Sequence, residues 1–386
     1  MTTTINNEQK KLNVPNLRFP EFQGEWEYFL IDDVCSEFKS GKNIKADSIS
    51  ESGEYPVYGG NGLRGYTSSY NHDGLYVLIG RQGALCGNVR PVYGKTYITE
   101  HAIAVAGNEI SNTSFLHQLF LKMNLGQYSD QSAQPGLAVN KLLKLKVALP
   151  SVLEQTKIAS LLSLLDERIT TQNKIIDKLQ SLIKGIMVEL QKQGVDRGTW
   201  KKKFLGDVLS ERNERNTNLY QVFSVSVSQG IINQVDYLGR SFAAKDTSKY
   251  NVVHYGDLVY TKSPTGSFPY GIVKQSFNHE NVAVSPLYGV YKPHSFAVGA
   301  YLQEYFMSET NTHNYLHPLI QKGAKNTINI TNQRFLENCV LLPINDNELL
   351  LISKLLCSLN KKRENHQSIL QTYLKQKQYL LRQMFI

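Results

Sequence analysis

The chain has 386 residues, 41% of them hydrophobic and 19% charged, a composition typical of folded globular proteins. This length exceeds the ~250–300 residues at which a single core stops growing, so we expect more than one core. The polar N-terminus lacks the apolar middle of a secretory signal, and no apolar run approaches the ~20 residues of a membrane helix, so we expect a cytoplasmic protein that does not enter membranes.

The formal charge of +9 lies mostly in the second half of the chain, because residues 1–193 carry +1 and residues 194–386 carry +8. Such a basic balance is compatible with a polyanionic partner such as nucleic acid but does not require one. The cysteines form no CxxC pair, which favours plain thiols in a reducing compartment over disulfides or a zinc site. They are Cys35, Cys86, Cys339 and Cys357.

After a polar tail at residues 1–14, residues 15–150 are expected to form a β-rich globular region with some helix. Its central segment, GLYVLIGRQGALCGNV at 74–89, is rich in glycine and apolar residues, and a helix is expected at 115–123. The region closes with the short β-like run KVALP at 146–150.

A long proline-free stretch at 151–193 follows this run, and its apolar residues recur at spacings of three and four. This heptad pattern predicts a helix with a coiled-coil seam. The expected seam residues are Ile158, Leu162, Leu165, Ile169, Ile176, Leu179, Ile183, Ile186 and Leu190.

Residues 194–343 follow the same plan, with a glycine-rich run at 256–273, an expected helix at 298–308 and CVLLP at 339–343. The last helix, expected at 344–386, keeps the heptad register. Its seam residues are Ile352, Leu356, Leu359, Leu370, Tyr373, Leu380 and Met384. The polar residues Arg363, His366 and Lys377 also occupy seam positions, where they are expected to fix the pairing register at a cost in stability.

The only two tryptophans mark the same point in each half of the chain. Trp26 and Trp200 are each followed seven residues later by Asp-Val. We therefore predict an α+β fold of two tandem halves related by a pseudo-two-fold axis, each a β-rich region followed by a long helix. The two helices are expected to pair as an antiparallel coiled coil; the alternative is that each lies on its own domain.

The sequence contains no recognisable catalytic motif. No Pro-Pro dipeptide occurs, so the Asn/Asp-Pro-Pro-aromatic motif with which aminomethyltransferases hold a target amine is missing. A Walker A loop is incomplete because Val89 stands where its first glycine should be. His313 and His317 are four residues apart, but Asn314 replaces the glutamate of HExxH and Pro318 follows at once. We therefore expect no metal site, and the duplicated plan favours a binding scaffold over an enzyme with a scattered active site.

Polar side chains on glycine-rich turns are the candidates for contacting DNA, because Arg and Lys can bind guanine while Asn and Gln can bind adenine. For any single residue, a solvated surface charge or a turn position is the more common explanation, but the two clusters together favour a binding role. The candidates in the first half are Lys42, Asn61, Arg64, Tyr66, Arg81 and Gln82. Those in the second half are Arg212, Arg215, Lys262, Ser263, Thr265, Lys322, Lys325 and Asn326.

Several segments resemble the specificity (S) subunit of type I restriction-modification systems. They are PNLRFPEFQGEWE at 15–27, YPVYGGNGLRGY at 55–66, IGRQGALCG at 79–87 and LPSVLEQTKIASLLSLLDERI at 149–169. With the order region, helix, region, helix, the resemblance covers residues 15–386.

The resemblance implies a non-catalytic subunit that recognises DNA sequence. It implies that residues 15–150 and 194–343 are target recognition domains, each reading one half of an asymmetric bipartite site in double-stranded DNA. Helices 151–193 and 344–386 would be conserved spacers that dock two methyltransferase (M) subunits, joined by endonuclease (R) subunits. S-adenosylmethionine would then bind to M, and ATP and Mg to R. Two alternatives are a structural coiled-coil adaptor without a DNA role and a fused restriction or methylation enzyme.

Overall fold

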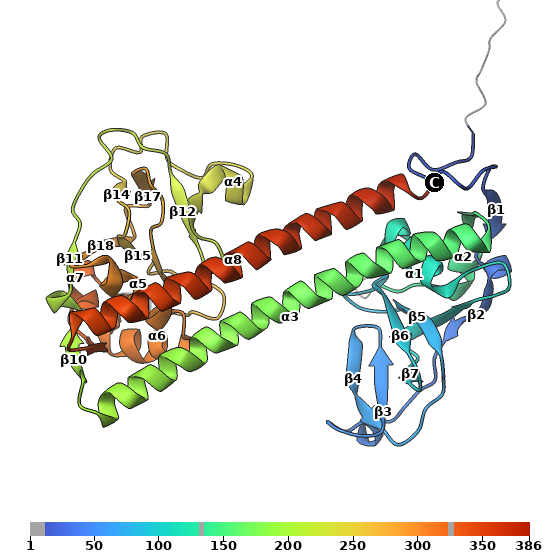
Figure 1. The fold of residues 1–386 in the computed structure, drawn as a ribbon, viewed down its shortest axis with the longest axis horizontal. Coiled ribbons are helices and arrows are strands. Elements are labelled where there is room, and N and C mark those ends of the chain that lie inside the picture. Colours follow the sequence, from blue (N-terminus) through green and yellow to red (C-terminus); the bar gives the residue numbers. More distant parts are fainter. Residues whose placement is uncertain (1–11, 131–134, 323–327) are drawn as a thin grey trace, which may run out of the picture. The chain divides into compact units, whose positions relative to one another are not determined.

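The computed structural model describes residues 12–130, 135–322 and 328–386, and its chain divides into two compact units (Figure 1). Unit 1 comprises residues 1–173 and 368–386, and unit 2 comprises residues 174–367. Most of the expected polar tail, residues 1–11, lies outside the described residues. Each of the two long helices, α3 (Val152–Asp196) and α8 (Asp346–Gln383), contributes one part to each unit.

Unit 1 contains a four-stranded antiparallel sheet in the order β2-β8-β5-β6. Its strands are β2 (Cys35–Ser40), β8 (Ala102–Gly107), β5 (Leu75–Gly80) and β6 (Val89–Tyr93). A smaller sheet beside it has the order β4-β3-β7 and contains β3 (Tyr55–Gly59), β4 (Gly62–Thr67) and β7 (Tyr97–Ile98). The short helix α2 (Val139–Leu143) precedes the last strand of the unit.

Unit 2 repeats the four-stranded antiparallel sheet in the order β11-β18-β15-β16. Its strands are β11 (Leu209–Glu211), β18 (Gly289–Pro293), β15 (Leu258–Tyr260) and β16 (Val273–Gln275). Additional two-stranded pairs are β12 (Phe223–Ser226) with β13 (Gly230–Asn233), β14 (Asn251–Val253) with β17 (Val282–Val284), and β19 (Gln321–Lys322) with β20 (Ile328–Asn329). The short helices of the unit include α4 (Gln234–Leu238), α6 (Glu309–Leu316) and α7 (Asn332–Phe335).

In each β-rich region the first strand pairs with the last strand. In unit 1, β1 (Glu27–Leu30) pairs with β9 (Lys146–Leu149), and in unit 2, β10 (Trp200–Phe204) pairs with β21 (Cys339–Pro343), both antiparallel. Trp26 and Trp200 are buried at these openings. The strand β1 leads into a 3₁₀ turn in which Asp33 Oδ2 accepts a hydrogen bond from the Leu30 N–H at 3.0 Å. The repeated Trp and Asp-Val segments thus hold equivalent places in the two copies.

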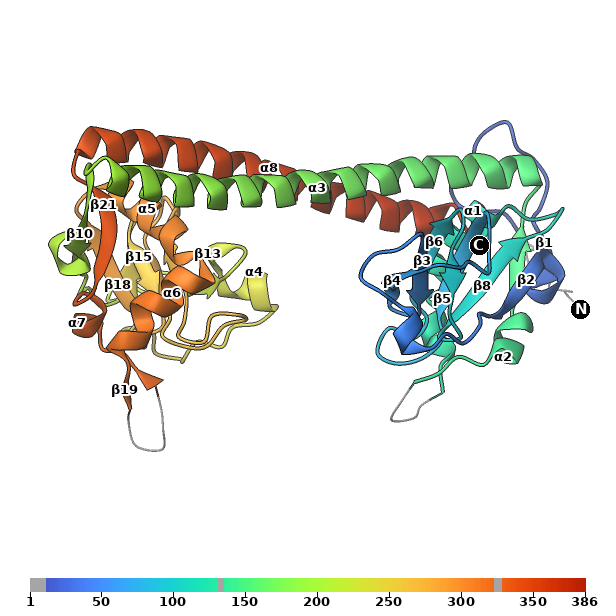
Figure 2. The ribbon, with the colours of Figure 1, turned by 90° about the horizontal axis from the view of Figure 1, so that it is seen from below.

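In each unit a short helix lies between the sheet and the long helices (Figure 2). This helix is α1 (Thr113–Met123) in unit 1 and α5 (Phe296–Phe306) in unit 2. Its buried side chains share one hydrophobic core with both long helices, as Phe115 does with Ile158 in unit 1 and Tyr301 does with Ile352 in unit 2. The amphipathic faces of the long helices are therefore covered partly by the β-rich regions and partly by each other.

The two long helices run antiparallel. In unit 1 the early part of α3 meets the late part of α8, where Lys377 Nζ lies 2.5 Å from Asp166 Oδ1 and the Arg168 guanidinium lies 5.9 Å from the Tyr373 ring centroid. In unit 2 the late part of α3 shares a core with the early part of α8. Every seam residue expected from the heptads is buried or half-buried. The predicted fold class, with β-rich halves each followed by a long helix and the helices antiparallel, is confirmed.

Candidate nucleic-acid interface

The loop between β5 and β6, residues 81–88, presents Arg81 on a fixed backbone. The Arg81 N–H donates to the His101 carbonyl at 2.9 Å, and the Arg81 carbonyl accepts from the Leu137 N–H at 2.9 Å. Its guanidinium has no hydrogen bond to any residue that the structure describes. Beside it, Gln82 Oε1 lies 3.2 Å from His101 Nδ1. Two other segments therefore fix the Arg81 backbone by hydrogen bonds, and the donors of its guanidinium are available to a ligand.

The glycine turn at residues 59–62 lies directly against this loop. A Cβ on Gly60 would be 2.7 Å from the His101 carbonyl oxygen, and a Cβ on Gly80 would be 2.8 Å from the Gly60 carbonyl oxygen. Only glycine permits so close an approach of the two backbones. As a result Asn61, exposed at the tip of the turn, lies near Arg81.

Arg64 and Lys42 flank the same turn. Across the β3–β4 pair, Val57 faces Gly65 and Tyr58 faces Leu63, so Arg64 is the extra residue of a β-bulge. Bulges redirect side chains, and here the Arg64 side chain lies beside Gly59. Lys42 forms a parallel bridge with Thr99, whose N–H donates to the Tyr58 carbonyl at 2.8 Å.

Five of the six candidates of the first half are thus brought together around one turn: Lys42, Asn61, Arg64, Arg81 and Gln82. The sixth, Tyr66, lies further along β4, where its backbone exchanges two hydrogen bonds with Ser50. Sequence reasoning missed Arg90 on β6, whose guanidinium lies against Gly62. No local pattern marks Arg90, because its importance depends on a turn 28 residues earlier in the chain.

In unit 2 the equivalent loop, between β15 and β16, holds Lys262, Ser263 and Thr265. Lys262 has a φ of 59°, a left-handed conformation that costs energy for a side chain other than glycine. Burial lowers the pKa of its ammonium group, and the negative charge of Glu211 opposes that shift. Thr265 and Phe268 exchange two backbone hydrogen bonds of 3.0 Å, which shape the tip of the loop, and Ser263 is exposed. The repeat therefore places Arg81 and Lys262 in the same loop of the two sheets.

Arg212 and Arg215 are engaged within the fold. Arg212 binds both carboxylate oxygens of Asp257, at 2.5 and 3.0 Å, and lies 3.4 Å from Glu214. Burial alone would lower the pKa of Arg212, but Asp257 and Glu214 together raise it. Arg215 donates to the Asn251 side-chain oxygen at 2.5 Å and to the Lys249 carbonyl at 3.0 Å. Most of their donors are occupied, so this geometry favours a structural role for both arginines.

The remaining candidates lie near the β19–β20 pair. The backbone of Lys322 pairs with that of Ile328. Lys325 and Asn326 lie outside the residues that the structure describes.

Among the described residues, no group of three or more His, Cys, Asp or Glu side chains could hold a metal ion. His313 and His317 stack with ring centroids 5.1 Å apart, and the four cysteines are free thiols. None of the helices within the described residues has an apolar stretch that could span a membrane.

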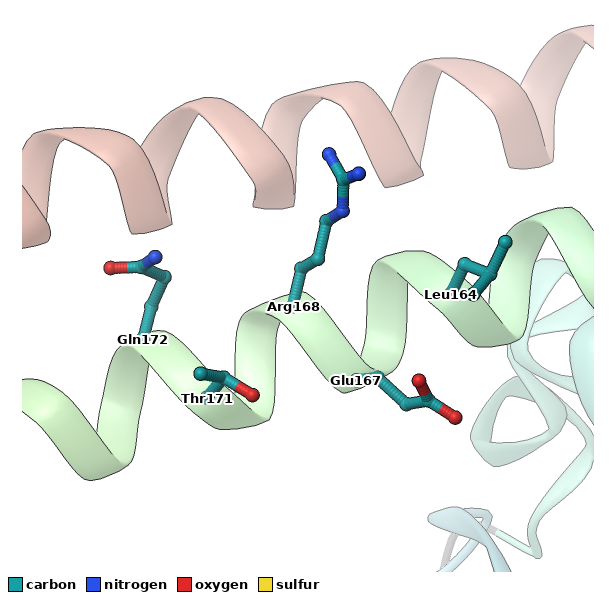
Figure 3. A pocket seen from close by; sticks show the side chains of 5 residues that line it. All are labelled: Leu164, Glu167, Arg168, Thr171 and Gln172. Carbon is teal, nitrogen blue, oxygen red and sulfur yellow. The ribbon is translucent and has the colours of Figure 1, made fainter.

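A depression of about 220 Å³ follows α3 in unit 1 (Figure 3). Its lining contains Leu164, Glu167, Arg168, Thr171 and Gln172. Arg168 and Gln172 point toward α8, whereas Glu167 points away from it (Figure 3). The lining thus combines one leucine with scattered polar groups along the helix pair, and the glycine-turn cluster remains the better candidate for a functional site.

Residues 23–181 match the family model described as the type I restriction modification DNA specificity domain. The chain is 43% identical over 154 residues to the type I restriction enzyme EcoprrI specificity subunit of Escherichia coli. That match spans 39% of this chain and 38% of the relative, so it covers less than half the length of either protein.

The fold is similar to the crystal structure of a type I restriction-modification system S subunit from M. genitalium, with a TM-score of 0.72 and 13% identity. The superposition covers 97% of this chain and 99% of that one. This likeness concerns the fold, while the match to the family model concerns residues 23–181. Together these findings show that residues 23–181 are similar to the type I restriction modification DNA specificity domain and that the whole chain shares the fold of the M. genitalium S subunit.

Proposed function

We propose that the chain is the DNA-recognition subunit of a type I restriction-modification complex, in which each β-rich region reads one half of an asymmetric bipartite site. The observation that carries this proposal is the shared loop of the repeated sheet. It presents Arg81 and Gln82 in unit 1 and Lys262 and Ser263 in unit 2. Because the same loop carries different donors and acceptors, the two halves of the target would differ in sequence.

The chemistry of these side chains suits reading of the major groove. Arginine and lysine can bind O6 and N7 of guanine, glutamine can bind adenine, and each good pair discriminates by ~1–3 kcal/mol. Lys42 and Arg64 beside the unit 1 loop would add phosphate contacts, which position a protein on DNA without specifying sequence. The surplus of positive charge in the second half of the chain would support the same contacts in unit 2.

The long helices would set the distance between the half-sites and dock the partner subunits. With 45 residues, α3 has a length of roughly 68 Å. Residues 15–150 and 194–343 would be the recognition domains and residues 151–193 and 344–386 the spacers. Two methyltransferase subunits would bind the spacers, and endonuclease subunits would join them.

This chain would catalyse no step itself and would work in the cytoplasm. S-adenosylmethionine would be bound by the methyltransferase subunits, and ATP and Mg²⁺ by the endonuclease subunits. Its own contribution would be to select the DNA sequence on which those subunits act.

Methylome sequencing tests the proposal. The chain and its methyltransferase partner would be expressed together in a host that lacks other modification systems. We expect methylated adenines within one bipartite, asymmetric motif, and none when the partner is expressed alone. A partner that methylates the same motif without this chain, or no bipartite motif with it, would refute the proposal.

A further inference from the structure

Arg90 is a half-buried cation in the layer between the two sheets of unit 1. It faces Leu78 across the β5–β6 pair and lies on the same face of β6 as Val92, two residues further on. Leu78 and Val92 belong to the small apolar cluster between these sheets. Arg90 Nε is buried and has no hydrogen-bond partner among the described residues.

No carboxylate balances this charge within the part of the chain that the structure describes. Glu100, in the segment beside the glycine turn, has its Oε1 3.2 Å from His101 Nε2, and its buried Oε2 has no partner among the described residues. Taking a charged group out of water without a partner is costly, and a bound anion removes that cost. A negatively charged ligand at this place would supply the partner that the Arg90 guanidinium lacks among the described residues.

The half-buried Arg90 guanidinium lies directly against the glycine turn. A Cβ on Gly62 would lie 2.2 Å from Arg90 Nη1 and 2.9 Å from its Cζ, so any side chain at this position would displace the arginine. On the other side of the turn, a Cβ on Gly59 would lie 2.8 Å from the Arg64 side chain. The same Cβ would lie 3.4 Å from the Thr99 hydroxyl, which is buried and has no partner among the described residues. Two arginines therefore flank a turn that carries almost no side-chain bulk.

We propose that Arg90 and Arg64 together bind one phosphate of the DNA backbone at the turn formed by residues 59–62. This assignment rests on the proposed function. It separates a phosphate-binding part of the unit 1 surface, at Arg90 and Arg64, from a base-reading part, at Arg81 and Gln82. The planar guanidinium matches the geometry of phosphate oxygens, and glycine lets a backbone come close to the ligand. Arg90 is too recessed to enter a groove, whereas Arg81 and Gln82 stand on the neighbouring loop and read base edges.

Salt-dependent binding separates a phosphate contact from a base contact. The full chain, assembled with its methyltransferase partner, would be titrated with the bipartite duplex and with a shuffled duplex at several salt concentrations. For Arg90→Gln we expect roughly tenfold to a hundredfold weaker binding to both duplexes. The slope of log K against log salt should fall by about one, because one phosphate contact is lost. The methylated motif should stay the same.

Two further variants control for charge and folding. Arg90→Lys keeps the positive charge and should retain most of the salt slope, and an unchanged circular dichroism melt would show that the fold survives. Lys141→Gln removes a lysine of α2 in the same unit that already pairs with Asp130 at the exposed surface, and it should leave the slope unchanged.

The possible contrary results point to different errors. If Arg90→Gln leaves the slope and both affinities unchanged, or relaxes one base position of the motif, the phosphate assignment is wrong while the proposed function stands. If the wild-type complex binds no duplex in preference to the shuffled one, the proposed function itself is wrong.

Discussion

Trp200 donates its indole N–H to Glu348 Oε1 across 2.7 Å, whereas the indole N–H of the equivalent Trp26 is buried with no partner among the described residues. In unit 1 the glutamate at the matching place, Glu154, is held instead by Arg18 with two hydrogen bonds of 2.8 Å. The two copies of the repeat therefore use one equivalent pair of positions in two ways. In unit 1 the segment before Trp26 supplies an arginine that competes for the carboxylate.

Replacing Trp200 by phenylalanine should lower the free energy of unfolding more than the same change at Trp26. Both changes remove a similar amount of buried aromatic surface, but only Trp200→Phe takes a donor away from a half-buried carboxylate, at a cost of ~1–3 kcal/mol. Urea unfolding followed by circular dichroism would measure the difference. Equal losses for the two variants would mean that the Glu348 hydrogen bond contributes nothing to stability.

Replacing Arg18 by methionine should destabilise unit 1 strongly. The Glu154 side chain is 1% exposed, and removing its partner leaves a buried carboxylate, which costs about 3 kcal/mol or more. The matched control is Lys157→Met, because Lys157 pairs with Glu21 at the exposed surface of the same helix start, where ion pairs contribute ~0–1 kcal/mol. Denaturation of the two variants side by side tests the ranking, and a smaller loss for Arg18→Met than for Lys157→Met would contradict it.

Stability should fall in mild acid because of His117. Burial lowers the pKa of His117 from 6.5 to about 4; the positive charge of Lys377 adds to the shift and Asp166 opposes it. Between pH 6.5 and pH 4 the unfolded chain binds a proton at this histidine that the folded chain does not. The stability that the neutral His117 contributes is therefore fully present above pH 6.5 and is lost as the pH falls to 4.

His117→Asn should flatten this dependence. The full effect of the histidine is at most roughly 3 kcal/mol, as 1.4 kcal/mol corresponds to one pKa unit. Unfolding free energies at neutral pH and near pH 4.5 would be compared for the wild type and the variant. The carboxyl groups of the chain titrate alike in both proteins, so the difference between them reports His117. An identical pH dependence in the two proteins would show that His117 is not the group responsible.

The duplicated architecture could be predicted because short-range sequence patterns indicate its main elements. The heptads of the long helices, the proline that closes each β-like run and the buried tryptophans all depend on short-range sequence. What the patterns did not show is that each long helix is divided between the two units. That division follows from which β-rich region covers each part of the helix, and it depends on long-range packing such as the core that Ile158 and Phe115 share in unit 1.

The candidate site was predictable in part for the same reason. Glycine-rich turns marked the Arg81 and Lys262 loops, and the structure places these in equivalent positions of the repeat. The engagement of Arg212 could not be seen in the sequence, because Asp257 lies 45 residues further along the chain. Arg90 was missed because only the fold brings it against Gly62.

The central claim, that each unit reads its own half of the DNA target, is tested most directly with Arg81→Ala and Lys262→Ala. The chain assembled with its methyltransferase partner would methylate a library of duplexes in which every base pair of the motif is varied. We expect Arg81→Ala to relax or weaken recognition in one half-site only, and Lys262→Ala in the other only, each by ~1–3 kcal/mol. If either variant alters recognition equally in both halves, the assignment of one unit to one half-site is wrong.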